Sequence, residues 1–371
     1  GVIKDWGNGH TEIDFSAGYV KPLDWLGSTL EKSKTYVDNM RAAYGEEKAD
    51  KILFDGPPHA CIFPNLFLGE METLYQRGVR HFKFVDRTFK LKIESSIKIM
   101  EFFLNKQDEQ IFLHFELIPD HLPDKLKSTI ERFPAHSLQF EIGIQSLDQN
   151  VQSLISRKQN NTKTAENISW LNQHSHAHIH ADLIIGLPGE DLSTFASGFN
   201  ELVAINPDEI QIGILKRLRG TPIIRHTDDY DMRFNPLPPY NILSNRDIDF
   251  ATMQRLGRFS RYWDIIINNG RFNNSKELIL GDDPFNNFLT LSDWMFEETE
   301  QTHKFSLQRL FKLLYLGMTD CLNIDASAVE EKLLVDFEAS GIKGLPKFSM
   351  KQDNQVSRQL QGSQRQQRHT H

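Results

Sequence analysis

The strongest constraint on the fold is a regular alternation of two sequence patterns between residues 72 and 215. Short runs of β-branched and aromatic residues predict strands, and segments with apolar residues at spacings of three and four predict helices. Because the connections are short, each strand is expected to return to the same parallel sheet, as in a partial (β/α) barrel or an open sheet. The predicted strands are 81–89, 110–117, 138–146, 178–188 and 209–216, and the predicted helices between them are 95–104, 122–133, 164–174 and 192–205.

A parallel sheet of this kind holds its functional site at the carboxyl ends of the strands. This rule selects residues before any family is considered. The residues that follow the predicted strands are Asp86, Arg87, Thr88, Glu116, Gln145, Ser146, 186–190 and Lys216.

Composition narrows the class of protein. The net charge of −8 argues against a nucleic-acid or anionic-membrane surface as the main feature, so neither nucleic acid nor a membrane is an expected partner. Two cysteines, Cys61 and Cys321, provide neither a disulfide framework nor a four-cysteine metal site. No apolar run is long enough to span a membrane and no signal peptide precedes residue 30, which predicts a cytosolic protein. The opening at Gly1, in the middle of a structured-looking pattern, suggests a piece of a longer protein.

Four regions differ in amino-acid composition and in the periodicity of their apolar residues. Residues 1–71 are rich in Gly, Pro, Trp and Asp, residues 72–220 hold the strand and helix alternation, and residues 221–350 form an extension predicted to be helical at 248–267, 306–317 and 328–338. Residues 351–371 are polar and low in complexity, which predicts a disordered tail.

Several motifs from residue 72 to about 350 resemble radical S-adenosylmethionine (radical SAM) proteins, specifically the cobalamin-associated group with a carboxyl-terminal extension. The motifs are FKFVDRTF, FEIGIQS followed by ISRKQNNT, HADLIIGLPGED, and LKRLRGTP. The resemblance implies a barrel that binds S-adenosylmethionine and a [4Fe–4S] cluster, and a parent reaction that is radical chemistry initiated from S-adenosylmethionine.

The same resemblance implies roles for individual residues. Residues matching the family's cofactor site are Asp86, Arg87 and Thr88 near the methionine amino group, Gln145 and Arg157 near the ribose and carboxylate, and Asp182 on the fifth strand. Ser146 follows Gln145 in the same site, and Gly186 and Gly189 lie in a turn that lets backbone approach the adenine. The chemistry agrees, since an Arg fork suits a carboxylate and Asp accepts from ribose hydroxyls.

One expected motif is missing from the printed sequence. The family holds its cluster with three cysteines spaced CxxxCxxC just after the first strand, and this chain matches the family only from METLYQRGV, residues 71–79, interpreted as the first barrel helix. A single cysteine cannot hold such a cluster. The sequence therefore predicts at best weak binding of S-adenosylmethionine and no cleavage.

Residues 1–71 resemble a different family, the catalytic domain of the large subunit of Rieske-type aromatic-ring-hydroxylating oxygenases. The matching segments are GVIKDWGNGHTEIDF and GPPHACIFPNLFLGE. His10 and His59 match motif positions of that family but not its iron ligands, so its iron is not expected to bind. An oxygenase fragment is thus an alternative function, and a chimera joined near Met71 is the implied origin.

A third alternative is a non-catalytic binding or oligomeric module. Without its first strand the predicted sheet has an open edge, which favours pairing with another chain. The segment HACIFPNLFL is interpreted as a strand that could fill this edge, although Pro64 suits a central strand poorly. The alternate histidines of HSHAHIH could bind a divalent metal, but a structural role is favoured because spacing alone provides no converging geometry.

Overall fold

A computed structural model describes residues 2–5, 10–14, 64–85, 93–106, 110–346 and 348. Two compact units make up the chain. The first unit contains Gly1–Ile144 and Gln159–Asp182, and the second contains Gln145–Lys158 and Leu183–His371.

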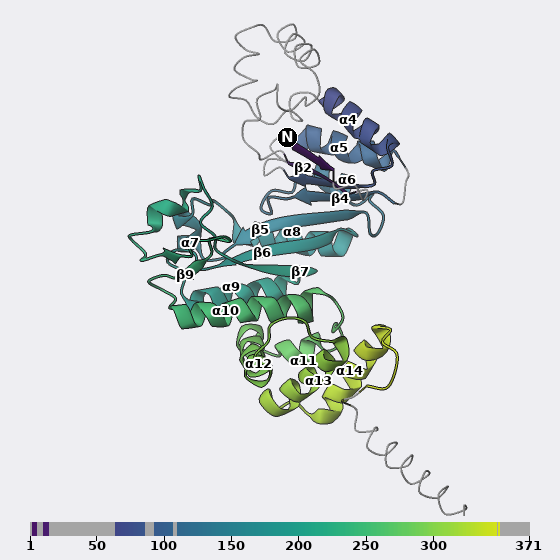
Figure 1. Cartoon of the computed structure of the whole chain (residues 1–371). Coiled ribbons are helices and arrows are strands. Elements are labelled where there is room, and N and C mark those ends of the chain that lie inside the picture. The colour runs from purple at the N-terminus through teal and green to yellow at the C-terminus, as the bar shows by residue number, and fades with distance from the viewer. Residues whose placement is uncertain are drawn as a thin grey trace, which may run out of the picture. The chain divides into compact units, whose positions relative to one another are not determined.

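Seven strands form one sheet in the order of the sequence, from β1 to β7 (Figure 1). Strands β1 and β2 are antiparallel, whereas β2, β3, β4 and β5 pair in parallel. The strands are β1 Val2–Asp5, β2 His10–Asp14, β3 His81–Val85, β4 Phe112–Glu116, β5 Leu138–Gln145, β6 His178–Ile185 and β7 Glu209–Ile214. The predicted fold class, α/β with a parallel sheet of five strands and a helical extension, is confirmed by β3 to β7 and the helices that follow.

One face of the sheet in the first unit is apolar. Phe82 and Phe84 of β3 are 1% exposed, and Phe82 packs on Phe103 of a helix with ring centroids 4.8 Å apart. Alternate residues of β4 and β5 are buried in the same way, as the two-residue period of a strand requires. The helices of this unit are α4 Pro64–Gln76, α5 Ile93–Leu104, α6 Asp124–Ile130 and α8 Asn161–His174.

The prediction of a strand over HACIFPNLFL is wrong in its second half. Pro64–Gln76 is helix α4, and Pro64 is its first residue, where the missing N–H would have no partner in the helix anyway. Met71, 1% exposed, lies four residues beyond Phe67 and so on the same helical face. The position beside β3 is taken by β2, which pairs with it from His10 to Asp14. Self-association through an open edge stays a prediction.

The second unit is mainly helical. Its elements are α7 Gln149–Leu154, α9 Leu192–Ile205, η2 Pro222–His226, β8 Arg233–Phe234, β9 Ile242–Ser244, α10 Phe250–Trp263, η3 Asp264–Asn268, α11 Lys276–Leu280, α12 Pro284–Thr299, α13 Leu307–Leu316, η4 Gly317–Cys321 and α14 Ala326–Ala339 (Figure 1). An aromatic cluster joins its helices. The ring of Phe199 in α9 lies 4.8 Å from Trp263 of α10, and Phe288 of α12 lies 5.0 Å from the same ring. No helix in the described ranges is both long and apolar enough to cross a membrane.

Two glycines of this unit provide a matched test of the packing. At Gly317, a Cβ would clash with Leu291 and lie 3.1 Å from Trp294, so Gly317→Ala is expected to destabilise the protein by about 1–3 kcal/mol through overpacking. At Gly257, inside α10, a Cβ would meet nothing within 4 Å, so Gly257→Ala should stabilise by about 0.5–1 kcal/mol. Urea denaturation of both variants measures the difference. Equal effects of the same sign would contradict the packing.

Candidate functional site

The carboxyl end of β5 has an unusual backbone. Gln145 adopts a φ of 70°, in the left-handed region that residues other than glycine seldom occupy. Its side chain is half-buried and has no hydrogen-bond partner among the residues that the structure describes. Strained backbone at the end of a parallel strand is typical of binding sites, because surrounding structure must hold the residue there for a reason other than stability.

The next residue joins two strand ends. Ser146 is buried, and its hydroxyl donates a hydrogen bond to a side-chain carboxyl oxygen of Glu190, which follows β6. The same hydroxyl accepts from the backbone N–H of Asp148 at 3.2 Å, and the side-chain amide of Gln152 donates to the Ser146 carbonyl at 2.8 Å. The loop after β5 is therefore fixed to the loop after β6 by polar contacts that are themselves buried.

Glu190 is the most strongly perturbed acid in this cluster. It is 2% exposed, and burial raises its pKa from the ordinary 4.5 to about 8, with the negative charges of Asp148 and Asp191 acting in the same direction. Its second oxygen, Oε2, has no hydrogen-bond partner within the described part of the chain. Glu190 is therefore a neutral carboxylic acid at pH 7, able to donate one hydrogen bond.

The GLPGE turn, residues 186–190, is shaped by its own neighbours in the second unit. Gly186 has a φ of 90°, and a Cβ there would lie 2.7 Å from Ile242. Gly189 has a φ of 77°, and a Cβ would lie 2.9 Å from Leu154. Both the backbone conformation and this close packing require glycine. Packing within the second unit is therefore enough to explain why both positions hold glycine.

Side chains from the turn before α10 hold the same loop. The Asn245 amide donates to the carbonyls of Gly186 and Leu187 at 3.3 and 3.4 Å, and Asp247 accepts from the Gly189 N–H at 3.1 Å. These hydrogen bonds engage two carbonyls and one N–H of the GLPGE turn. They fix the turn relative to the start of α10.

Arg157 lies in a second clamped loop. Its backbone N–H donates to the Gln152 carbonyl at 2.7 Å, and its side chain is half-buried. The loop before it is held by Arg225, whose guanidinium donates to the Leu154 carbonyl at 2.8 Å and to the Ser156 hydroxyl at 2.6 Å. Ser156 itself has a φ of 58°. The η2 helix therefore positions the segment that contains Arg157.

The sheet face of the first unit that lies opposite the buried phenylalanines, called the inner face below, has a separate polar network. The carboxylate of Glu141 on β5 lies 2.8 Å from His114 Nε2 on β4 and 3.4 Å from Lys83 Nζ on β3. The hydrogen bond with His114 and the charge of Lys83 lower the pKa of Glu141 to about 2 against the desolvation that opposes them. On β6, His180 Nε2 lies 3.6 Å from Asp182 Oδ1, and both side chains are largely buried. Glu141 is therefore a permanent anion at neutral pH.

The structure divides the predicted site residues into three groups. Gln145, Ser146, Arg157, Gly186 and Gly189 all belong to the second unit. Gln145 ends β5 and Ser146 follows it, Arg157 lies in the loop after α7, and the two glycines follow β6; hydrogen bonds link these segments as described. Asp182 belongs to the inner face of the first unit, paired with His180. Asp86, Arg87 and Thr88 lie outside the described residues.

Sequence reasoning missed two kinds of residue. Lys83, His114 and Glu141 lie within strands, and the signal was available: each of them stands between two apolar residues, where the strand alternates polar and apolar positions. Asn245 and Arg225 come from distant segments with no motif, so only the tertiary structure identifies them as clamps.

The groups that could hold a metal are scattered. His174 stacks on Trp170 at 5.2 Å between ring centroids, while His180 pairs with Asp182, so the HSHAHIH histidines do not converge. Among the described residues, no group of three or more His, Cys, Asp or Glu side chains is placed to hold a metal ion. Burial raises the pKa of the Cys321 thiol, which disfavours the thiolate form, and Cys61 lies outside the described residues.

Comparison with known proteins gives a family model that matches part of the chain and several partial relatives. A family model described as "Protein of unknown function (DUF4080)" matches residues 228–371. The oxygen-independent coproporphyrinogen III oxidase of Paracoccus denitrificans is 30% identical over 71 residues, 19% of this chain and 16% of that protein. The oxygen-independent coproporphyrinogen-III oxidase-like protein HemZ of Bacillus subtilis is 23% identical over 161 residues, 43% of this chain and 28% of that protein. The chain thus spans less than a third of the length of these curated relatives.

Two of the solved structures that align with this chain are radical SAM enzymes. Coproporphyrinogen III oxidase (HemN) from Escherichia coli aligns with a TM-score of 0.41 and 13% identity over 74% of this chain and 73% of its own. The radical S-adenosylmethionine methyltransferase TsrM from Kitasatospora setae, with cobalamin and a [4Fe–4S] cluster bound, aligns with a TM-score of 0.42 and 13% identity over 77% of this chain and 57% of its own.

Glu190 gives the site a measurable pH dependence. Its folded pKa of about 8 lies above the ordinary 4.5, so the folded protein holds a proton that the unfolded chain loses between these values. Stability contributed by the neutral acid is complete below pH 4.5 and is lost as pH rises to 8. Glu190→Gln keeps a neutral side chain and should melt at least about 3 °C above the natural protein at pH 9.

The control for this prediction is Glu201→Gln, an exposed glutamate of α9 in the same unit. It should follow the natural protein at every pH. Thermal melts from pH 5 to 9 make the comparison, and parallel curves for the natural protein and Glu190→Gln would show that Glu190 is ionised in the fold.

The anion of Glu141 should stabilise the sheet in the opposite pH range. Its pKa is depressed, so its contribution is complete above 4.5 and is lost as pH falls towards 2. Glu141→Gln should therefore cost about 1–2 kcal/mol at pH 7, and this loss should shrink as the pH is lowered from 4.5. Guanidinium denaturation at pH 7 and pH 3 measures it, with the exposed Glu131→Gln as control. A loss that is the same at both pH values would rule out the charge as its source.

Proposed function

We propose that this chain is the S-adenosylmethionine-binding part of a radical SAM-like protein, and that these 371 residues alone bind the cofactor without cleaving it. The ligand site lies at the strand-end loops of the second unit. Gln145 and Arg157 contact the ribose and carboxylate, Ser146 belongs to the same cofactor site, and the GLPGE turn faces the adenine. The family resemblance also suggests Asp86, Arg87, Thr88 and Asp182 as cofactor residues.

The observation that supports this proposal most strongly is Gln145. A half-buried amide without a hydrogen-bond partner in the described structure, on strained left-handed backbone at the end of a parallel strand, is expensive for folding alone. An amide offers both a donor and an acceptor, which suits hydroxyl and carboxylate groups of a nucleoside-linked amino acid. The bonds of Ser146 to Glu190 and of Gln152 to Ser146 keep it in place.

The residues present do not fit the iron–sulfur cluster of the parent chemistry. Such a cluster requires clustered thiolates, and the 371 residues contain only Cys61 and Cys321, far apart in sequence. Burial keeps Cys321 a neutral thiol, and its Sγ lies 3.8 Å from the Thr290 carbonyl. When bound, a cluster would supply the electron that cleaves S-adenosylmethionine. These 371 residues do not provide the set of cysteine ligands that would hold such a cluster.

Calorimetric titration with S-adenosylmethionine tests the proposal. We expect saturable binding, weakened about fivefold to tenfold by Gln145→Asn, since Asn tolerates the left-handed backbone but its shorter amide loses a hydrogen bond. Gln139→Asn is the matched control, because Gln139 lies at the other end of β5 and has no predicted role. It should bind like the natural protein.

Two results would contradict the proposal. The first is the absence of a binding heat with S-adenosylmethionine, and the second is equal weakening of binding by Gln145→Asn and Gln139→Asn. Either result would show that the end of β5 is not the binding site. Formation of 5′-deoxyadenosine after incubation with iron, sulfide and a reductant would show that these residues do support cleavage.

The relation of residues 1–71 to Rieske-type oxygenases stays a prediction, as do the chimera and the oligomeric module. Residues 6–9 and 56–63, which belong to the two segments that suggest the oxygenase, lie outside the described ranges. Sequencing reads across codons 65–80 would test whether the junction near Met71 is real.

A further inference from the structure

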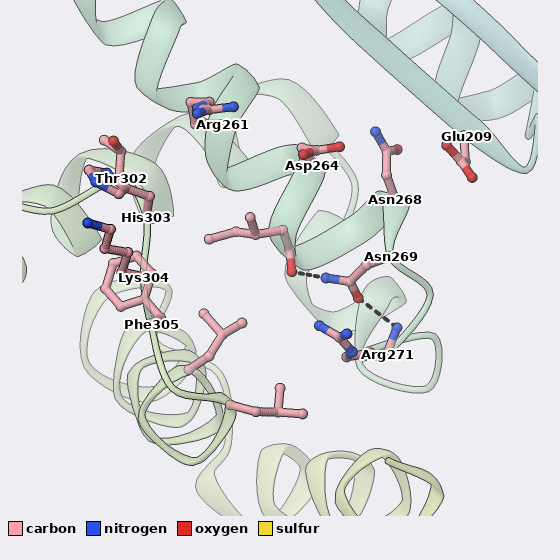
Figure 2. A pocket seen from close by; sticks show the side chains of 13 residues that line it. Glu209, Arg261, Asp264, Asn268, Asn269, Arg271, Thr302, His303, Lys304 and Phe305 are labelled. Carbon is pink, nitrogen blue, oxygen red and sulfur yellow. Dashed lines mark hydrogen bonds between the residues drawn. The ribbon is translucent and has the colours of Figure 1, made fainter. Parts of the chain in front are cut away.

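A cavity of about 530 Å³ opens in the second unit, at the amino end of β7. The proposed cofactor loops follow the carboxyl ends of strands, so this cavity lies at the opposite end of β7 from that edge. Its walls come from three places: the η3 turn after α10, the loop that follows it, and the segment 302–305 between α12 and α13 (Figure 2). Its size is that of ordinary small-molecule sites.

Positive charge gathers on this cavity although the chain as a whole has a net charge of −8. Arg261, Arg271 and Lys304 line it, and none of them has an ion-pair partner among the described residues. Elsewhere in the same unit, Arg255 is engaged by Asp293 at 2.6 Å. Three exposed cations on one hollow attract an anion, and a planar guanidinium matches phosphate particularly well.

Acidic and apolar groups complete the lining. Glu209, at the start of β7, and Asp264, in η3, lie across the cavity from the segment 302–305 in Figure 2. Carboxylates there would repel a second anionic group but accept hydrogen bonds from hydroxyls. Phe305 and Leu310 add an apolar surface of the kind on which a sugar ring can rest.

The walls are held in place by the protein itself. The Asn269 side chain donates to the Ile265 carbonyl and accepts from the Arg271 N–H at 2.9 Å, which fixes the backbone of Arg271. Asn268 exchanges two hydrogen bonds with Ile210 of β7, at 3.0 and 3.2 Å.

The opposite wall is fixed as well. The Tyr262 hydroxyl, next to Arg261, donates to the Gln301 carbonyl at 2.6 Å, just before the segment 302–305. Arg309 donates to the Gln301 side chain at 3.1 Å and lies over the Phe305 ring. A site with both walls fixed loses little conformational freedom when a ligand binds.

The η3 turn explains how the cavity forms. Residues 264–268 make a π-helical turn at the end of α10, which inserts an extra residue into the helix. The turn lets Asn268 bond to β7 while Asp264 and Ile265 line the cavity. Such turns occur frequently at functional sites.

We propose that this cavity binds a hydroxylated organic phosphate of the sugar-phosphate class. The phosphate contacts Arg261, Arg271 and Lys304, the hydroxyls face Asp264 and Glu209, and the ring rests on Phe305. This ligand is distinct from S-adenosylmethionine, and the site is independent of the strand-end loops that hold the cofactor.

Calorimetric titration of the full chain with glucose 6-phosphate tests this proposal, with glucose and inorganic phosphate as probes that each lack one half of the ligand. We expect saturable binding of glucose 6-phosphate at one site, at least about tenfold weaker binding of inorganic phosphate, and none of glucose. Affinity should fall as salt is raised, because the cations are exposed.

Variants locate the binding. Arg261→Gln combined with Arg271→Gln should weaken glucose 6-phosphate at least about tenfold, since two charge-assisted hydrogen bonds are lost. Arg233→Gln removes the same charge from an exposed arginine of β8 outside the cavity and should change the affinity less than about twofold. Melting temperatures of all variants confirm that they fold.

Three outcomes would overturn the proposal: no saturation with glucose 6-phosphate, equal binding of inorganic phosphate, or equal loss in Arg233→Gln and the double variant. Because none of these measurements involves S-adenosylmethionine, failure here leaves the cofactor proposal standing, and the reverse also holds.

Discussion

The sheet of the first unit depends on a row of aromatic rings packed across three strands. Phe84 of β3 stacks on Phe115 of β4 with centroids 4.4 Å apart, and Phe140 of β5 follows at 6.4 Å. These residues are register partners, and each is at most 1% exposed. Because side chains alternate between faces, a slip of one residue would move this row into solvent, so burial of the rings fixes the register.

The polar face follows from the same constraint. Once the rings are buried, Lys83 and His114 must point to the other face, where they are register partners. Glu141 lies two residues beyond Gln139, the partner of His114, so the His114–Glu141 bond is diagonal. The low pKa of Glu141 is therefore a consequence of hydrophobic packing on the opposite side of the sheet. A network of this kind is satisfied within the protein and orders the inner face.

The sequence indicated the elements whose pattern is local and missed those whose stability is tertiary. Strands β3 to β7 were predictable because their apolar runs are short and bounded by turns. Helix α12 was not, because Asp283, Asn286 and Asn287 at its start resemble a loop; in the fold Asp283 caps the helix and accepts from Asn286. Gln145 and Ser146 could be selected by the strand-end rule alone, whereas the burial that raises the pKa of Glu190 depends on segments that meet only in the folded chain.

Helix α10 connects the two ends of the second unit. The turn before it holds the GLPGE loop through Asn245, and its last residues lead into the turn that lines the cavity. A 14-residue helix is about 21 Å long, so two ligands at its ends would not touch. Coupling would require α10 to shift, and its face is fixed by Phe259 and Trp263, whose rings pack at 5.1 and 5.0 Å on Phe288. Such a packed core is not continuously deformable. The helix therefore holds the two proposed sites in fixed positions. The binding free energies of S-adenosylmethionine and of the sugar phosphate should then add without coupling.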